Sequence, residues 1–73
     1  MFSARLEVEM INRKYDLELP ESDEYETLAG LIMFYNEDIP SQKEVVEVDQ
    51  YSFTIETTTR NRIETVSVRV LQK

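Results

Sequence analysis

The sequence contains no cysteine and no histidine, and it has one glycine among its 73 residues. The first two absences exclude disulfides, thiolate nucleophiles, His-based catalytic triads and zinc sites built from His or Cys. A single glycine excludes the glycine-rich loops that bind nucleotide phosphates. Serine, threonine, lysine and glutamate remain, but no spacing places an activated nucleophile beside a base. The sequence therefore predicts a domain that is not an enzyme.

Long apolar runs are missing as well. The longest run, residues 28–35, is eight residues long, whereas a helix needs about 20 apolar residues to span a bilayer. Residues 1–5 lead straight into charged sequence and lack the apolar core of a signal peptide. We expect no direct membrane insertion by these residues, and any membrane segment that the domain serves should lie elsewhere.

Basic residues are scarce where acidic residues gather. The formal net charge is −7, and residues 15–42 hold eight acidic and no basic side chains. The flanking segments nearly balance, with +1 over residues 1–14 and zero over residues 43–73. Proteins that bind nucleic acid need Lys and Arg to displace counterions from phosphates, and anionic lipids attract basic segments in the same way. Nucleic acid and anionic membrane surfaces are therefore disfavoured partners.

One helix is predicted near the start of the chain. Residues 4–6 read as a short strand or extended entry, and the apolar spacing that follows predicts a helix over residues 7–14. Pro20 keeps Leu19 out of the helical region, so residues 17–20 should be extended at their end. A second helix should begin just beyond this proline.

Acidic residues mark the start of the second helix. Asp23 and Glu26 match a capping box, with Ser22 as a competing N-cap. An apolar stripe with helical spacing follows: Tyr25, Leu28, Ala29 and Ile32. The rest of the helix is apolar nearly all round, and residues 36–38 should end it before Pro40.

After Lys43 the period changes from helical to alternating. Three sets of apolar residues alternate with polar neighbours and predict strands: Val46 and Val48, then Tyr51, Phe53 and Ile55, then Val66, Val68 and Val70. Ile63 is out of phase, which a bulge near residues 64–65 would repair. Turns are expected at residues 49–50 and 58–61, with Asn61 the best candidate for a left-handed conformation. The predicted fold is α+β, with two helices packed on a small antiparallel sheet in the order β-α-α-β-β-β.

Five segments follow one another in a telling order: Leu19-Pro20, Tyr25-Glu26-Thr27-Leu28-Ala29-Gly30-Leu31-Ile32, Ile39-Pro40, Tyr51-Ser52-Phe53-Thr54-Ile55, and Arg62-Ile63 with Val66-Ser67-Val68. Over about residues 4–70, this order resembles the CorC/HlyC transporter-associated domain. The Tyr-x-Thr-Leu-x-Gly-Leu core carries most of the resemblance. Family members usually have glycine in turns where this chain has residues 36–38, Lys43 and residues 49–50, so the departures fall in loops.

The resemblance implies a cytoplasmic accessory domain on the inner side of the cell membrane. It would be a single domain, residues 1–73, and a C-terminal piece of a larger membrane protein associated with magnesium or cobalt efflux and often labelled hemolysin-like. Its partners there would be a transmembrane region and a pair of CBS nucleotide-sensing modules. The fold is similar to one half of FAD-binding (PCMH-like) domains. A module that binds flavin (FAD) or adenine nucleotide is therefore one alternative, and a free-standing interaction domain is another, although we expect no cofactor.

Four acidic residues suggest a cation site: Glu21, Asp23, Glu24 and Glu26. Carboxylate oxygens are the ligands that Mg²⁺ prefers, but Mg²⁺ rarely has a dedicated cage made only of protein ligands. The spacing of these residues is also not that of an EF-hand loop. We favour solvated acids at a helix N-terminus and assign no metal site.

Gly30 lies inside the second predicted helix, where glycine costs about 1 kcal/mol relative to alanine. Close approach of the helix to the sheet, with Thr27 on the same side, would compensate for this cost. Contact of the Gly30 backbone with a ligand is the less favoured alternative, because no glycine-rich phosphate loop surrounds it. Thr27, Gly30 and Pro40 are therefore expected to have structural roles.

Two further clusters are candidate contact sites. Met33, Phe34 and Tyr35 would form either core or an exposed apolar patch that meets another subunit, as in a homodimer, or the rest of the parent protein. Arg60 and Arg62 are the only clustered basic residues that could contact a flavin. Solvated charges on a hairpin are the favoured interpretation of these arginines, since charged residues are mostly exposed.

Overall fold

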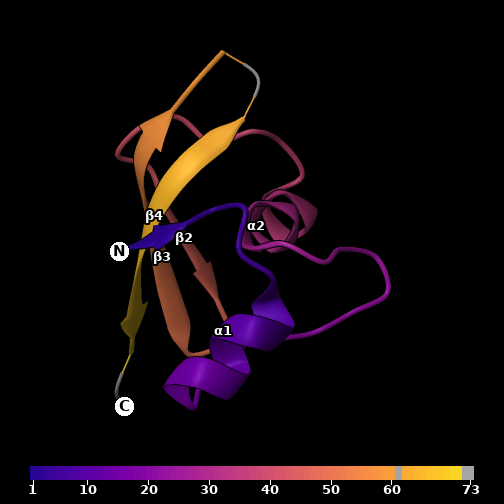
Figure 1. The fold of residues 1–73 in the computed structure, drawn as a ribbon. Helices are drawn as coiled ribbons and strands as arrows, with labels where there is room; N and C mark the ends of the chain where they lie inside the picture. The colour runs from indigo at the N-terminus through magenta and orange to yellow at the C-terminus, as the bar shows by residue number, and fades with distance from the viewer. Residues whose placement is uncertain (61, 72–73) are drawn as a thin grey trace.

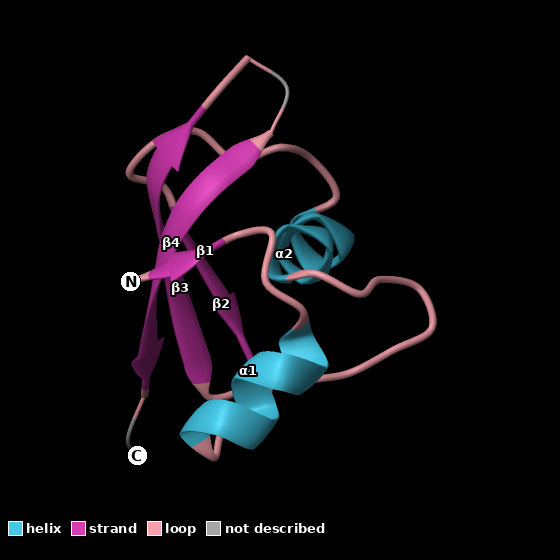
Figure 2. Cartoon of the chain, in the orientation of Figure 1, coloured by secondary structure: helices cyan, strands magenta, loops and turns pink. Residues whose placement is uncertain are grey.

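A computed structural model of the chain describes residues 1–60 and 62–71. Its elements are β1 Phe2–Ser3, α1 Val8–Tyr15, α2 Leu28–Asn36, β2 Val45–Val48, β3 Tyr51–Thr58 and β4 Ile63–Val70. The strands form one antiparallel sheet in the order β1-β4-β3-β2. Both helices lie on the same face of this sheet, and no helix of the described residues covers the other face (Figures 1 and 2). The structure thus confirms the predicted α+β fold and its element order.

The core fills the space between the helices and the covered face of the sheet. It combines side chains from both helices with alternate residues of the strands: Val8, Ile11, Leu28, Leu31, Ile32, Phe53, Ile55, Ile63 and Val66 are almost completely buried. Strand residues alternate between faces with a period of two, which explains why the predicted apolar sets all point to one side. Pro40 is also buried.

The first strand lies earlier in the chain than predicted. Ala4 still donates its N–H to Glu64 O (2.9 Å), but residues 4–6 then leave the sheet in a turn, where Leu6 N–H donates to Ser3 O (3.2 Å). Helix α1 follows one residue later than expected and ends at Tyr15; its C-cap residue, Asp16, has a left-handed φ of 57°. The prediction of an extended entry at residues 4–6 was therefore wrong, because the turn redirects the chain toward α1.

Helix α2 begins later than the acidic residues suggested. Its N-cap is Thr27, whose Oγ1 accepts a hydrogen bond from Gly30 N–H (3.2 Å). Ser22 instead accepts a hydrogen bond from Glu24 N–H within a turn (3.0 Å). Glu26 O accepts from the N–H of Val8 (2.9 Å), which ties this segment to α1. The predicted capping box was wrong, since tertiary hydrogen bonds hold residues 21–26 as a loop.

The meander follows the predicted strands closely. The pairing of β3 with β4 shifts twice, between Ile55 and Thr57 and between Thr57 and Thr58. The second shift leaves Glu64 as an extra residue of β4, which confirms the predicted bulge. The first shift leaves Glu56 as an extra residue of β3, which the alternation of apolar residues did not reveal.

In the part of the chain that the structure describes, four residues other than glycine have positive φ angles: Asp16 at 57°, Glu37 at 63°, Lys43 at 72° and Asp49 at 54°. The last three occupy the turns in which related proteins were expected to have glycine. The chain therefore keeps the left-handed turns without the residue that adopts them most easily. Asn61, predicted to be left-handed, lies outside the described residues.

Candidate functional site

The exposed end of α2 forms an apolar patch. Leu28, Leu31 and Ile32 are fully buried, whereas Met33, Phe34 and Tyr35, near the end of this nine-residue helix, reach the surface. Together with Ile39 they make up what we call the α2 patch, with exposed fractions of 37% for Met33, 48% for Phe34, 46% for Tyr35 and 42% for Ile39. A helix that is apolar nearly all round cannot bury every side against one small sheet. The α2 patch is the apolar surface that this helix cannot bury.

Aromatic contacts hold the α2 patch against the preceding loop. Ring centroids lie 5.4 Å apart for Tyr25 and Phe34, and 5.3 Å apart for Phe34 and Tyr35. Tyr25 is almost buried and donates its hydroxyl to Pro20 O (2.7 Å). Burial, with a smaller effect of the neighbouring Tyr35 hydroxyl, raises the pKa of Tyr25 to about 12. Tyr25 is therefore a neutral anchor beneath two partly exposed rings.

Gly30 allows that loop to approach the helix. A Cβ at Gly30 would lie 3.0 Å from the Cβ of Tyr25 and 3.4 Å from Thr27 Oγ1. The close approach predicted from sequence exists, but it is to the loop before α2 and not to the sheet. Gly30 and Thr27 thus act together: Thr27 caps the helix and Gly30 leaves room for Tyr25.

The acidic residues of the loop do not converge on one point. Glu21 and Glu26, but not Asp23 or Glu24, line a hollow of about 210 Å³ together with Glu7, Val8, Glu9, Ser22 and Tyr25. Within residues 1–60 and 62–71, no group of three or more Asp, Glu, His or Cys side chains is placed to hold a metal ion. The residues present therefore do not fit a Mg²⁺ site, and we assign no metal to the loop carboxylates.

Asn12 of α1 holds the acidic loop in place. Its side-chain amide donates to Leu19 O (2.9 Å) and accepts from Leu19 N–H (2.9 Å), as a neighbouring strand would. It also donates to Glu21 Oε2 (2.8 Å). Tyr51 supports the same segment, because its hydroxyl accepts from Glu18 N–H (2.7 Å). Sequence reasoning missed Asn12, whose only signal was a polar residue directly after the buried Ile11.

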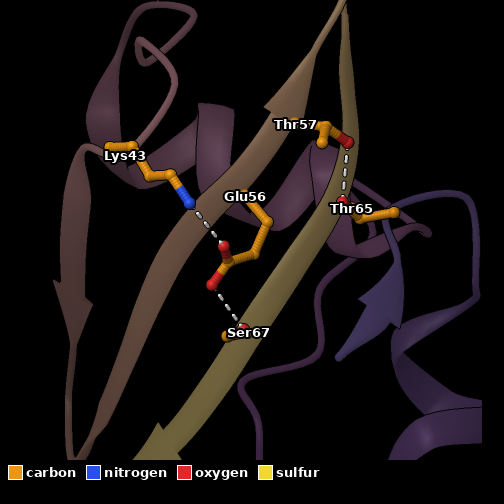
Figure 3. Close-up of polar contacts among 5 residues, drawn as sticks. All are labelled: Lys43, Glu56, Thr57, Thr65 and Ser67. Carbon is orange, nitrogen blue, oxygen red and sulfur yellow. Dashed lines mark hydrogen bonds and ion pairs between the residues drawn. The ribbon is translucent and has the colours of Figure 1, made fainter.

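The face of the sheet that no described helix covers carries a cross-strand polar network (Figure 3). Glu56 accepts hydrogen bonds from Ser67 Oγ (2.7 Å) and Lys43 Nζ (3.0 Å). Beside it, Thr57 and Thr65 share a hydrogen bond of 2.6 Å. The Ser67 hydrogen bond, and then the Lys43 contact, lower the pKa of Glu56. Glu56, the extra residue of β3, thus links β3 to β4 and to the segment just before β2.

Arg60 and Arg62 lie apart from these features. Both are exposed at the β3–β4 hairpin, where Thr59 N–H donates to Arg62 O (2.8 Å). Figure 1 shows this hairpin projecting beyond α2, at the end of the sheet away from α1. Neither arginine lines the acidic hollow. Neither lines a second hollow, which Glu56 and Ser67 line on the sheet face that no described helix covers. No observation therefore favours a flavin or nucleotide site at these residues.

Comparison with known families gives the relationship of the chain. The family model described as "Transporter associated domain" (CorC_HlyC) matches residues 1–72. The chain belongs to the CorC/HlyC transporter-associated domain family. This confirms the resemblance seen in the sequence. Among curated proteins, no relative matches this CorC/HlyC domain.

Solved structures share the fold of this CorC/HlyC domain. A region described as associated with a Mg²⁺ and Co²⁺ transporter (CorC), from Neisseria meningitidis, has 26% identity and a TM-score of 0.84, covering 94% of this chain and 84% of that one. A CorC_HlyC domain from Haemophilus ducreyi has 26% identity and a TM-score of 0.77, covering 99% and 95%. The transporter-associated domain of a CBS domain protein from Porphyromonas gingivalis has 19% identity and a TM-score of 0.81, covering 97% and 86%.

No helix among the described residues of the domain is long and apolar enough to cross a membrane. The family is nevertheless associated with membrane transporters. The α2 patch, the acidic hollow and the open sheet face are therefore surfaces of a domain from a transporter-associated family.

Proposed function

We propose that this domain is a non-catalytic accessory module of a CorC/hemolysin-type membrane protein, and that it acts by docking on its neighbours through the α2 patch. The observation that carries the proposal is the run of partly exposed apolar side chains at Met33, Phe34, Tyr35 and Ile39. Phe34 and Tyr35 contact each other within this patch, and apolar patches on a protein surface mark interaction sites. Membership of a transporter-associated family supports the proposal that these neighbours belong to a transporter.

The size of the α2 patch favours a neighbour in the same polypeptide. Four side chains, each exposing less than half of its surface, offer far less than the roughly 800 Å² per partner of a stable interface. Tethering raises the effective concentration of a neighbouring domain to about the millimolar range, so a small contact suffices there. We therefore expect the isolated domain to be monomeric, with docking that depends on the parent chain.

The aromatic contacts make the α2 patch ready for docking. Phe34 and Tyr35 are already fixed against each other and against the buried Tyr25. Side chains that are ordered before binding lose little conformational entropy when they bind. The patch is thus preorganised, as a surface used in regulated contacts should be.

The neighbours that we propose are a CBS pair and a transmembrane region, with the domain on the cytoplasmic side of the membrane and C-terminal to both. Two relatives support this arrangement, since one comes from a CBS domain protein and another is associated with a Mg²⁺ and Co²⁺ transporter. The role is to tune assembly or gating of the parent, which exports magnesium or cobalt in this proposal.

The test is an NMR titration of the ¹⁵N-labelled chain with the CBS pair of the parent protein. We expect saturable shifts of the Met33, Phe34 and Tyr35 amides. Phe34→Gln should abolish these shifts. Met10→Gln is the matched control, because Met10 is 41% exposed on α1, away from the patch, and this variant should bind like the wild type. Shifts confined to another surface, or equal binding by both variants, would remove the α2 patch from the proposal.

A further inference from the structure

One edge of the sheet is only partly covered. Strand β1 has two residues, which pair with Val66 and Thr65 of β4. Strand β4 continues to Val70, and Figure 1 shows it running past β1 toward the C-terminal end of the chain. Beyond Val66, no described residue pairs with β4 on the β1 side. An uncovered stretch of strand edge presents unpaired N–H and C=O groups.

The register shows which backbone groups point to this edge. Leu71 donates its N–H to Gln50 O (2.6 Å) on the β3 side, whereas Ala4 donates to Glu64 O (2.9 Å) on the β1 side. Hydrogen bonds alternate along an antiparallel pair. Ser67 and Arg69, like Leu71, therefore direct their backbone groups to β3, and Val68 and Val70 direct theirs away from it. The open edge offers two N–H donors and two C=O acceptors.

The side chains along this edge are apolar on the helix-covered face and basic on the other. Val70 is 47% exposed and Val68 is half-buried against the core. Beside them, Phe2 packs edge-on against the exposed Tyr15, with centroids 5.0 Å apart. Arg69 is exposed on the open face. A strand placed here would need apolar residues facing Val68 and Val70, and an acidic residue opposite Arg69 to pair with its charge.

We infer that the β4 edge at Val68–Val70 is a strand-addition site for an extended segment that runs antiparallel to β4 in the line of β1, with an apolar–acidic–apolar pattern. The inference rests on the proposed function in one respect only: the segment is taken to come from the parent protein. A strand added in this way would anchor the domain through backbone hydrogen bonds. The α2 patch would then supply the second contact.

A second copy of the chain does not fit this edge. Because β1 already occupies the space beside Val66, the antiparallel register that uses Val68 and Val70 of both copies pairs Val68 of one copy with Val70 of the other. That register sets Arg69 opposite Arg69 of the second copy, and like charges directly opposite each other are destabilising. An acidic segment that continues β1 along the edge of β4 neither overlaps β1 nor places two arginines opposite each other.

The test extends the chain before Met1 by Thr-Val-Glu-Val, with Gly-Gly-Ser-Gly and Thr-Val-Lys-Val as matched controls, and follows amide hydrogen exchange by NMR. We expect Thr-Val-Glu-Val to slow exchange at Val68 and Val70 at least tenfold. The glycine-rich extension should change nothing, and the lysine version should protect less than the glutamate version. Ser67 and Arg69, already bonded to β3, should stay unchanged. Equal exchange with all extensions, or Val68 and Val70 amides already protected in the chain itself, would overturn the inference.

A proline variant separates the edge from the fold. Val68→Pro removes an N–H that the sheet does not use, and proline is tolerated on edge strands when its missing N–H faces outward. We expect Val68→Pro to keep the fold but to cancel the protection that Thr-Val-Glu-Val gives to Val70. Arg69→Pro removes a hydrogen bond to β3 and should unfold the chain. Equal destabilisation by the two prolines would contradict the assigned directions of the backbone groups.

Because these measurements use this chain alone, they distinguish the edge from the proposed function. If the extension does not slow exchange at Val68 and Val70, the proposal of docking through the α2 patch is unaffected. If the α2 patch does not dock, the inference of strand addition at β4 is unaffected.

Discussion

Gly30 and Tyr25 lie so close that a Cβ on Gly30 would be 3.0 Å from the Tyr25 Cβ. Glycine is a poor residue for a helix interior, and alanine there normally gains about 1 kcal/mol. At position 30 this gain in stability is opposed, because the added Cβ would press against the Tyr25 Cβ, which no side-chain rotation can move away. The single glycine of the chain is thus explained by the loop that supports the α2 patch.

Gly30→Ala should therefore fail to stabilise the domain, and Gly30→Val should lower its melting temperature clearly. Thermal unfolding followed by circular dichroism measures both. The aromatic signal of Tyr25 should change with the valine variant, since the ring must move away from α2. A rise in melting temperature for Gly30→Ala, of the size expected for an open helix position, would show that the contact is not restrictive.

Glu37→Gly should stabilise the domain by about 0.5–1 kcal/mol, because Glu37 holds the left-handed C-cap of α2 at φ 63°. Glycine adopts this conformation without steric cost. Glu37→Ala is the control, since it removes the same charge from the negative end of the helix but keeps a Cβ. Urea unfolding should rank glycine above alanine. Equal stability of the two variants would mean that charge, and not backbone conformation, decides the effect.

Asn12→Ala should destabilise the domain by about 2–3 kcal/mol, because the N–H and C=O of the buried Leu19 both lose their partner. Lys14→Ala, at an exposed position of the same helix, should have little effect. Hydrogen exchange at the Leu19 amide should accelerate in the first variant and not in the second. An Asn12→Ala protein with wild-type stability would refute the clamp between α1 and the acidic loop.

The lowered pKa of Glu56 predicts a pH-dependent contribution to stability. A carboxyl whose folded pKa lies below its unfolded value of 4.5 stabilises the fold above that pH and loses this effect as the pH falls through the folded pKa. The wild type should therefore be more stable than Glu56→Gln at pH 7, with the difference shrinking in acid.

Urea unfolding from pH 7 to pH 3 measures this difference. Glu47→Gln is the control on the same sheet face, because it removes one carboxylate but leaves the contacts of Glu56 with Ser67 and Lys43 in place. A Glu56→Gln difference that stays constant across this range would show that the contacts with Ser67 and Lys43 do not favour the charged carboxylate.

The strands and the end of α2 could be predicted from sequence because local signals and tertiary packing agree there. Alternation with a period of two fixes which residues of β3 and β4 face the core, whatever their neighbours. Glu56 escaped prediction because a bulge residue on one strand is defined by its pairing partner. The pairing of Thr57 with Thr65 is a relation between strands, which no single segment contains.

The start of α2 could not be predicted for a similar reason. Asp23 and Glu26 carry a valid local capping pattern, yet the hydrogen bond from Val8 N–H to Glu26 O holds the segment in another conformation. Thr27 was visible as a candidate N-cap only after that contact was known. The α2 patch itself could be anticipated, since a helix apolar on all sides must expose some of its surface.

Ion efflux by the parent membrane protein tests the central claim most directly. Efflux should be compared for the intact protein, for the protein without this domain, and for Phe34→Gln with Met10→Gln as control. If the domain acts by docking through the α2 patch, deletion and Phe34→Gln will change efflux in the same direction, and Met10→Gln will leave it unchanged. Unchanged efflux and unchanged assembly after deletion of the domain would contradict the account.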